Sequence, residues 1–384
     1  MEATKIFSHD FFLLCLSQFA FSSIFHMFLP TLPIYLSKGG SNDTEVGILI
    51  GVLNISSLIL RPFVGKGLLK TPERTFMLAG TFLYVLCSLA YLVMPPFWPL
   101  LALRVFQGVG HAFFYTASFT LIASLTPETQ RGQGLSYFAL SMNMAAALGP
   151  VFGMFLVNAF GFSFLFAVGA ALSFCSLILT ARLGRRETTP LGSETHRNGA
   201  FFNSRAVPPS MMAFFTLLLI GGIGAFFPVY AIRQGMENPG IFFLTFSVML
   251  ILGRSFGGKM VDRYRRETVI LPCLVTQVVS MVILAFSKTT PLFIAVAVIW
   301  GAGHAFLFPT IMASVLDRAG SSRGPAMGTF TALTDLGGGL GPVIMGFILY
   351  HTNYTIMFLC LALSALINFI YFCFFVRRGE GRSE

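Results

Sequence analysis

Five ionisable side chains lie inside long apolar stretches of this 384-residue sequence: Asp335, His26, His111, His304 and Arg104. A carboxylate or imidazole in such surroundings can gain and lose a proton as its contact with water changes. A guanidinium can bind an anionic group through two parallel hydrogen bonds. These five residues are the candidates for proton coupling. Asp335 is the strongest of these candidates, because no other of the 15 acidic residues lies in the middle of an apolar stretch.

Other polar and aromatic residues share helical faces with these groups. His26 follows Ser22 by four residues and Gln18 by eight, and Arg104 shares a helical stripe with Gln107. Asn143 and Trp300 lie in other apolar stretches. Side chains on such faces are the candidates for lining a substrate cavity: Gln18, Ser22, His26, Gln107, His111, Tyr115, Asn143, Trp300, His304 and Asp335.

Each candidate has a structural alternative. The histidines could be hydrogen-bonded packing residues, and the similarity of His111 to His304 could be a relic of duplication. Arg104 could extend its charged end to the membrane surface. Asp335 could pair with an arginine or a hydroxyl group. Its helical face carries the small residues Gly328, Ala332, Gly339 and Pro342, which favours close packing beside a water-filled cavity.

The composition excludes a water-soluble protein. AVILMFWYC residues make up 55% of the chain and DEKR residues 10%, whereas soluble domains have about 25% charged residues. So few charges cannot cover a soluble surface, and so many apolar side chains exclude intrinsic disorder. The six cysteines lie in apolar stretches without disulfide or zinc spacing. No nucleotide-binding loop, catalytic triad or metalloprotease helix occurs, so we expect no enzyme, cofactor or metal site.

Twelve apolar stretches are long enough to cross a bilayer as helices, for which about 20 residues are needed. The sequence therefore predicts an all-α integral membrane protein. The expected spans are 11–36, 45–68, 76–95, 98–123, 133–158, 162–182, 210–232, 240–261, 268–287, 291–315, 325–350 and 354–376.

The positive charges predict the orientation of these spans. Of the 25 Lys and Arg residues, 19 fall on one side of the expected membrane, three on the other and three within or at the ends of spans. Because the cytoplasmic side carries the excess of Lys and Arg, we expect both termini and the polar linker 183–209 to be cytoplasmic. The short loops indicate a bacterial inner (plasma) membrane. A nucleic-acid partner is not expected, since the net charge of +10 is explained by this asymmetry.

The two halves of the chain repeat each other at an offset of about 193 residues. The segment GVGHAF at 108–113 returns as GAGHAF at 301–306, and Arg61 corresponds to Arg254. At an offset of 192, Leu-Gly-Pro at 148–150 returns at 340–342. Such parallel repeats of six helices occur in transporters, with the substrate site near mid-membrane between the halves. We therefore expect six-helix bundles at 1–182 and 210–384, joined by the linker 183–209.

Several motifs resemble those of a known family. The loop GKMVDRYRR at 258–266 is similar to the GxxxDRxGRR loop of the major facilitator superfamily, and its first-half equivalent at 65–74 is degenerate, with Leu69 in the acidic position. Arg104, Gln107 and Gly108 resemble the RxxQG element of span four. Gly149-Pro150 in span five, and more completely the glycines and proline of 328–346, resemble the glycine-proline signature of exporters.

The sequence is thus similar to major facilitator proteins of the drug and metabolite efflux branch. The resemblance implies two pseudo-symmetric six-helix halves and a conformational latch at the cytoplasmic loops. The latch candidates are Arg61, Lys66, Lys70, Arg74, Arg254, Lys259, Asp262, Arg263, Arg265 and Arg266.

The expected function is secondary transport by alternating access, as a proton-coupled exporter (antiporter) of small amphipathic molecules. The alternatives are a proton symporter or facilitator for sugars, organic acids or peptide-like metabolites, and a lipid or glycolipid flippase, which the phenylalanine-rich faces favour. The expected partners are a small-molecule substrate, protons and membrane lipids, and the expected state is a monomer.

Overall fold

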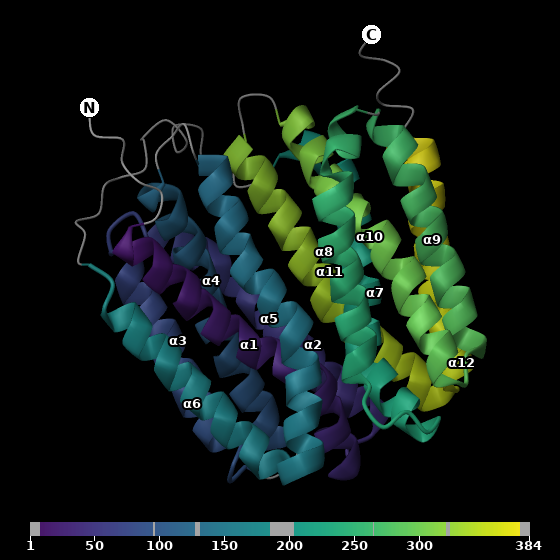
Figure 1. Ribbon diagram of the computed structural model, residues 1–384, viewed down its shortest axis with the longest axis horizontal. Coiled ribbons are helices and arrows are strands. Elements are labelled where there is room, and N and C mark those ends of the chain that lie inside the picture. The colour runs from purple at the N-terminus through teal and green to yellow at the C-terminus, as the bar shows by residue number, and fades with distance from the viewer. Residues whose placement is uncertain are drawn as a thin grey trace. The chain divides into compact units, whose positions relative to one another are not determined.

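The computed structural model describes residues 8–94, 97–126, 131–184, 203–263, 265–319 and 323–376. These residues form twelve α-helices, a short 3₁₀ helix (Ser204–Ala206) and a final π-helical turn (Phe372–Val376), without a β-strand (Figure 1). The α-helices are α1 (His9–Lys38), α2 (Asp43–Gly67), α3 (Glu73–Ala90), α4 (Trp98–Leu125), α5 (Arg131–Phe160), α6 (Phe162–Ala181), α7 (Val207–Arg233), α8 (Gly240–Arg263), α9 (Arg266–Phe286), α10 (Thr290–Arg318), α11 (Arg323–His351) and α12 (Tyr354–Tyr371).

The helices confirm the all-α membrane fold expected from the sequence. Ten of the helices in the described ranges are long and apolar enough to cross a membrane, and α8 contributes a shorter apolar segment, Gly240–Ser255. Each helix begins and ends within a few residues of its expected span, apart from α3 and α12, which stop five residues short. Helices are the expected solution because an apolar medium offers no other partners to backbone N–H and C=O groups.

Polar side chains satisfy the exposed ends of several helices. The backbone N–H of Phe11 donates to Oγ of Ser8 (3.2 Å) at the start of α1. At the start of α2, Asn42 and Glu45 exchange backbone-to-side-chain hydrogen bonds of 2.9 Å each, which is a capping box. These caps define the residues at which α1 and α2 begin.

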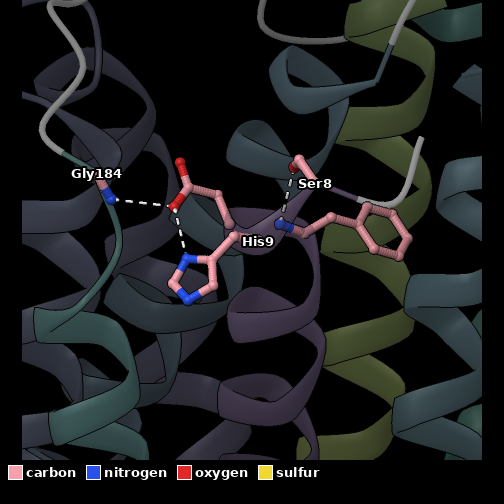
Figure 2. A network of polar contacts seen from close by, with 5 residues as sticks. Ser8, His9 and Gly184 are labelled. Carbon is pink, nitrogen blue, oxygen red and sulfur yellow. Dashed lines mark hydrogen bonds and ion pairs between the residues drawn. The ribbon is translucent and has the colours of Figure 1, made fainter. Parts of the chain in front are cut away.

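A polar contact joins the first and sixth helices at one end of their bundle. The backbone N–H of Gly184, just beyond α6, donates to Oδ1 of Asp10 (3.2 Å), and Nδ1 of His9 lies 4.0 Å from the same oxygen (Figure 2). Asp10 lies in the first turn of α1, where a carboxylate is favoured by the helix dipole. The contact holds the end of α6 beside the start of α1.

The chain divides into two compact units, unit 1 (Met1–Gly39 and Val52–Ser193) and unit 2 (Gly40–Gly51 and Glu194–Glu384). In unit 1, α1 packs along α5, and α3 packs along α4 and α6. In unit 2, α7 packs along α11, and α9 packs along α10 and α12, so each pairing recurs six helices later (Figure 1). This recurrence confirms the two pseudo-symmetric halves. The limits 1–182, 183–209 and 210–384 stay a prediction, since most of the linker lies outside the described residues.

Glycines explain why the short repeat GVGHAF and GAGHAF is kept in both halves. A Cβ on Gly301 would lie 2.8 Å from Cβ of Met249 on α8, and one on Gly303 would overlap Thr276 on α9. In unit 1, a Cβ on Gly108 would lie 2.5 Å from the carbonyl oxygen of Leu53 on α2. The first glycine of each repeat therefore packs on the second helix of its bundle, and the glycine two residues later packs on the third.

The glycines of α5 and α11 allow similarly close contacts. A Cβ on Gly149 would lie 2.7 Å from Cβ of His26 on α1, and one on Gly341 would overlap the carbonyl oxygen of Leu218 on α7. Within unit 2, Gly47 and Gly51 of α2 meet the backbone of α11 just as closely, at Pro342 and Gly339. Backbones approach so closely only where at least one of the two helices has a small residue at the contact.

We expect Gly341→Ala to lower the stability of the protein, because the new methyl group meets backbone of α7 rather than a movable side chain. Overpacking of this kind costs about 1–3 kcal/mol. The matched control is Gly65→Ala, since a Cβ on Gly65 meets nothing within 4 Å and alanine favours helix. Thermal unfolding of the detergent-purified variants measures both. Equal midpoints for the two variants would contradict the close packing of α7 on α11.

Candidate functional site

Three of the predicted cavity residues form one hydrogen-bonded network in unit 1. Nε2 of Gln18 donates to Oγ of Ser22 (2.8 Å), and Oγ of Ser22 lies 2.7 Å from the hydroxyl of Tyr115. Ser118, which the sequence analysis did not select, donates to Oε1 of Gln18 (3.0 Å). All four side chains are buried. The network therefore joins α1 to α4 through groups that satisfy one another.

Arg104 belongs to a second network of unit 1. Its Nη1 donates to Oε1 of Gln107 (2.9 Å), which also accepts a hydrogen bond from the hydroxyl of Tyr91 (3.0 Å). The guanidinium side chain is 5% exposed. Its charged end is therefore enclosed by the protein, and the roles expected of Arg104 stay predictions. A buried cation is costly unless partners surround it, and Gln107 supplies one of them.

Two histidines of unit 1 lie close to these networks. Nδ1 of His26 is 2.8 Å from the carbonyl oxygen of Ser22. Because a carbonyl accepts, this nitrogen carries the proton in the neutral ring, and Nε2 is left as the proton acceptor. The ring of His111 packs on that of Tyr115, with centroids 4.2 Å apart, and its Nδ1 lies 3.3 Å from Oγ of Ser57.

The corresponding part of unit 2 is aromatic. The ring of Trp300 lies 4.4 Å from that of Phe246, and the ring of His304 lies 5.5 Å from Phe246 and 6.0 Å from Phe308. Trp300 and His304 are 2% and 5% exposed. The structure thus brings these two candidates together on α10, beside α8.

Asp335 is a half-buried residue of α11, twelve residues after Arg323 and sixteen before His351. One turn further along the same face lies Gly339, whose carbonyl oxygen meets Gly51 of α2. The carboxylate is therefore next to the place where the first turns of α2 pack on α11 within unit 2. Its repeat counterpart in unit 1, Asn143, is half-buried on α5.

The residues expected to form the cytoplasmic latch lie in different environments. Arg74 donates to the carbonyl oxygen of Ala181 and so caps α6. Nε of Arg266 lies 3.0 Å from Oδ2 of Asp317, a partner that the sequence analysis missed. Arg61 and Arg254 are half-buried in α2 and α8, and Lys66, Lys70 and Arg265 are exposed. The side chains of Lys259, Asp262 and Arg263 lie outside the described part of the chain.

Four further polar residues were not selected from the sequence. Tyr91, Ser118 and Ser57 complete the networks of unit 1. Gln277 of α9 is fully buried, and neither atom of its amide has a hydrogen-bond partner among the described residues. Gln277 could have been found from the sequence, because it is a polar residue in the middle of an apolar stretch. Ser57 and Ser118 could not have been found in this way, because serine is common in membrane helices and does not by itself indicate a functional site.

The described residues contain no group of three or more His, Cys, Asp or Glu side chains that could hold a metal ion. The six cysteines are free. The side chains described above offer hydrogen bonding, stacking and proton transfer.

We expect Tyr115→Phe to destabilise the protein by about 1 kcal/mol, because Ser22 loses a buried hydrogen-bond partner while the stack on His111 is retained. Tyr350→Phe is the matched control, since Tyr350 is 56% exposed. Thermal unfolding midpoints of the two purified variants make the comparison. A loss no larger than that of the control would show that the hydroxyl contributes nothing to the network.

Comparison with known proteins identifies the family. The family model described as Major Facilitator Superfamily matches residues 14–253 and 239–384. The staphylopine export protein of Staphylococcus aureus is 24% identical over 94% of this chain and 93% of its own length. The quinolone resistance protein NorA of the same species is 23% identical over 83% of this chain and 84% of its own.

Solved structures support the same fold. A mutant form of the nucleoside transporter NupG superposes with a TM-score of 0.80 at 15% identity and covers 96% of this chain and 100% of its own. The family and these relatives are transporters and not enzymes, and export proteins are among them. With a family match over nearly the whole chain and twelve helices in two repeated halves, this multi-pass membrane protein belongs to the major facilitator superfamily of transporters.

Proposed function

We propose that this transporter is a proton-coupled exporter of small amphipathic molecules. Two relatives that match most of the chain are named for export or for drug resistance. Phenylalanine-rich helices of unit 2, such as α8 and α10, offer apolar surface to such a substrate. The expected location is the plasma membrane of a bacterium, since two similar proteins come from Staphylococcus aureus.

The observation that carries the proton coupling is the position of Asp335. The other acidic residues in the described helices lie near helix ends, whereas Asp335 lies in the middle of α11. An ionisable group at such a depth is costly and is typical of ion or substrate pathways. The glycines near it on α11 are in close backbone contact with α2 and α7.

In the proposed cycle, a proton and the substrate compete. With access to one side, the protonated carboxyl group of Asp335 releases its proton and the substrate binds. With access to the other, protonation favours release of the substrate. A proton that stabilises one state more than the other shifts the population between them. The histidines His26, His111 and His304 are the further groups that could exchange protons, and Arg104 adds a positive charge beside Gln107.

We expect Asp335→Asn to abolish transport driven by a pH gradient while substrate exchange without a gradient continues, because asparagine mimics the protonated form in nearly the same volume. Proteoliposomes with an imposed pH gradient and a panel of amphipathic substrates measure both activities. Glu237→Gln, a change in an exposed loop between α7 and α8, is the matched control.

Three results would contradict this assignment. Full gradient-driven transport by Asp335→Asn would move the coupling to a histidine. Loss of substrate binding at every pH would make Asp335 a ligand for a cationic substrate group. Proton movement in the same direction as the substrate would support the symporter alternative.

The expected orientation of the protein in the membrane can be tested directly. Cysteines introduced at Ser193, in the linker, and at Thr352, between α11 and α12, should face opposite sides of the membrane. In a cysteine-free background, an impermeant thiol reagent added to intact cells should label Thr352→Cys and leave Ser193→Cys unlabelled until the cells are opened. Labelling of Ser193→Cys from outside would overturn the cytoplasmic assignment of the linker and termini.

A further inference from the structure

Two buried nitrogens of α10 have no hydrogen-bond partner among the described residues. They are Nε1 of Trp300 and Nδ1 of His304, one turn apart on α10. An indole N–H can only donate, and leaving it buried without an acceptor is unfavourable. Most buried polar groups in proteins are paired, so both atoms need an explanation.

The residues of unit 1 that correspond to Trp300 and His304 do have hydrogen-bond partners within the protein. The equivalent residues of unit 1 are Gln107 and His111, at the offset of 193. Gln107 accepts hydrogen bonds from Arg104 and Tyr91, and His111 has Ser57 at 3.3 Å. At these two positions of unit 1, the polar side chains therefore have partners within the protein.

Unit 2 keeps polar groups at these positions but has lost their partners. At the same offset, Arg104 corresponds to Ala297, Tyr91 to Leu284 and Ser57 to Leu250. None of these three replacements can donate or accept through its side chain. The described part of the chain therefore supplies no hydrogen-bond partner for Trp300 or His304, and a bound ligand would provide one.

The surroundings indicate what such a partner would be. Phe246 faces both rings at 4.4 and 5.5 Å, and Phe308 stacks on His304 at 6.0 Å. Phenylalanine and tryptophan carry no charge, and the positive charge of Arg254, which acts on His304, disfavours a cationic ligand. Offset or edge-to-face contacts with aromatic rings are favourable. An aromatic ring that carries an oxygen or nitrogen acceptor would therefore match both the aromatic side chains and the indole N–H.

We propose that Trp300, His304, Phe246 and Phe308 form a subsite for an uncharged aromatic compound that carries a carbonyl oxygen beside its ring. The carbonyl oxygen accepts a hydrogen bond from Nε1–H of Trp300, and the ring packs on Phe246 and His304. Nδ1 of His304 binds a second polar atom, as donor or acceptor according to its tautomer. The subsite rests on the proposed function, because its ligand is a transported substrate that enters when α8 and α10 are open to solvent.

The chain allows a direct observation of the indole. It has two tryptophans, and Trp98 is 73% exposed, so Trp98→Phe leaves Trp300 as the one indole signal. The variant is labelled with ¹⁵N-tryptophan, placed in lipid nanodiscs and titrated with acetophenone. Ethylbenzene has the ring without the oxygen, and cyclohexyl methyl ketone has the carbonyl without the aromatic ring.

Acetophenone should move the indole proton resonance downfield in a saturable way. Ethylbenzene should give no downfield shift, and its binding, like that of cyclohexyl methyl ketone, should be about tenfold weaker. In the same background, His304→Leu and Phe246→Leu should weaken acetophenone binding by a similar factor. Phe286→Leu, at a 63% exposed position of α9, should not.

An indole resonance that acetophenone leaves unmoved, or that ethylbenzene moves equally, would overturn the subsite and leave Trp300 as a packing residue. The thermal unfolding midpoint of Trp98→Phe should equal that of the unaltered protein. The readout needs no proton gradient, so a negative result here is distinct from a failure of the Asp335 experiment.

Discussion

The need to satisfy every backbone polar group within an apolar medium is the constraint on which the rest of this structure depends. A chain with 10% charged residues that spans a membrane favours α-helices, because the backbone hydrogen bonds of a helix lie within the helix itself. Hydroxyl side chains follow the same rule, since Thr81 and Thr216 donate to carbonyl oxygens four residues earlier in their own helices. Once helices are formed, the remaining question is how they hold together without a strong hydrophobic effect between them.

Close backbone contact supplies much of that cohesion. Apolar side chains gain little by leaving lipid for protein, so helix association depends on packing and on hydrogen bonds between helices. The contacts of Gly149 with α1, Gly341 with α7 and Gly301 with α8 show the pattern, because none of these glycines could carry a side chain without moving backbone or a packed neighbour. The same positions recur in both halves, which explains why these short segments stay recognisable after most of the sequence has diverged.

Polar side chains, in contrast, have diverged between the halves. Unit 1 joins its helices with Gln18, Ser22 and Tyr115, and it surrounds Gln107 with donors. Unit 2 has aromatic residues around Trp300 and His304 and carries the carboxylate of Asp335 where unit 1 has Asn143. The two halves thus share a helical scaffold but differ in the polar side chains that it carries.

The amino-acid sequence alone determined the twelve helices, their repetition and the family, because these depend on local apolar length and on short motifs with strong steric requirements. It also selected Asp335, since a charge in an apolar stretch is visible without a fold. Only the tertiary structure decided which candidates meet. Contacts such as Tyr115 with Ser22, Arg266 with Asp317 and the first turns of α2 with α11 depend on helix rotation and on neighbours far away in the sequence, and periodicity within one helix contains no information on either.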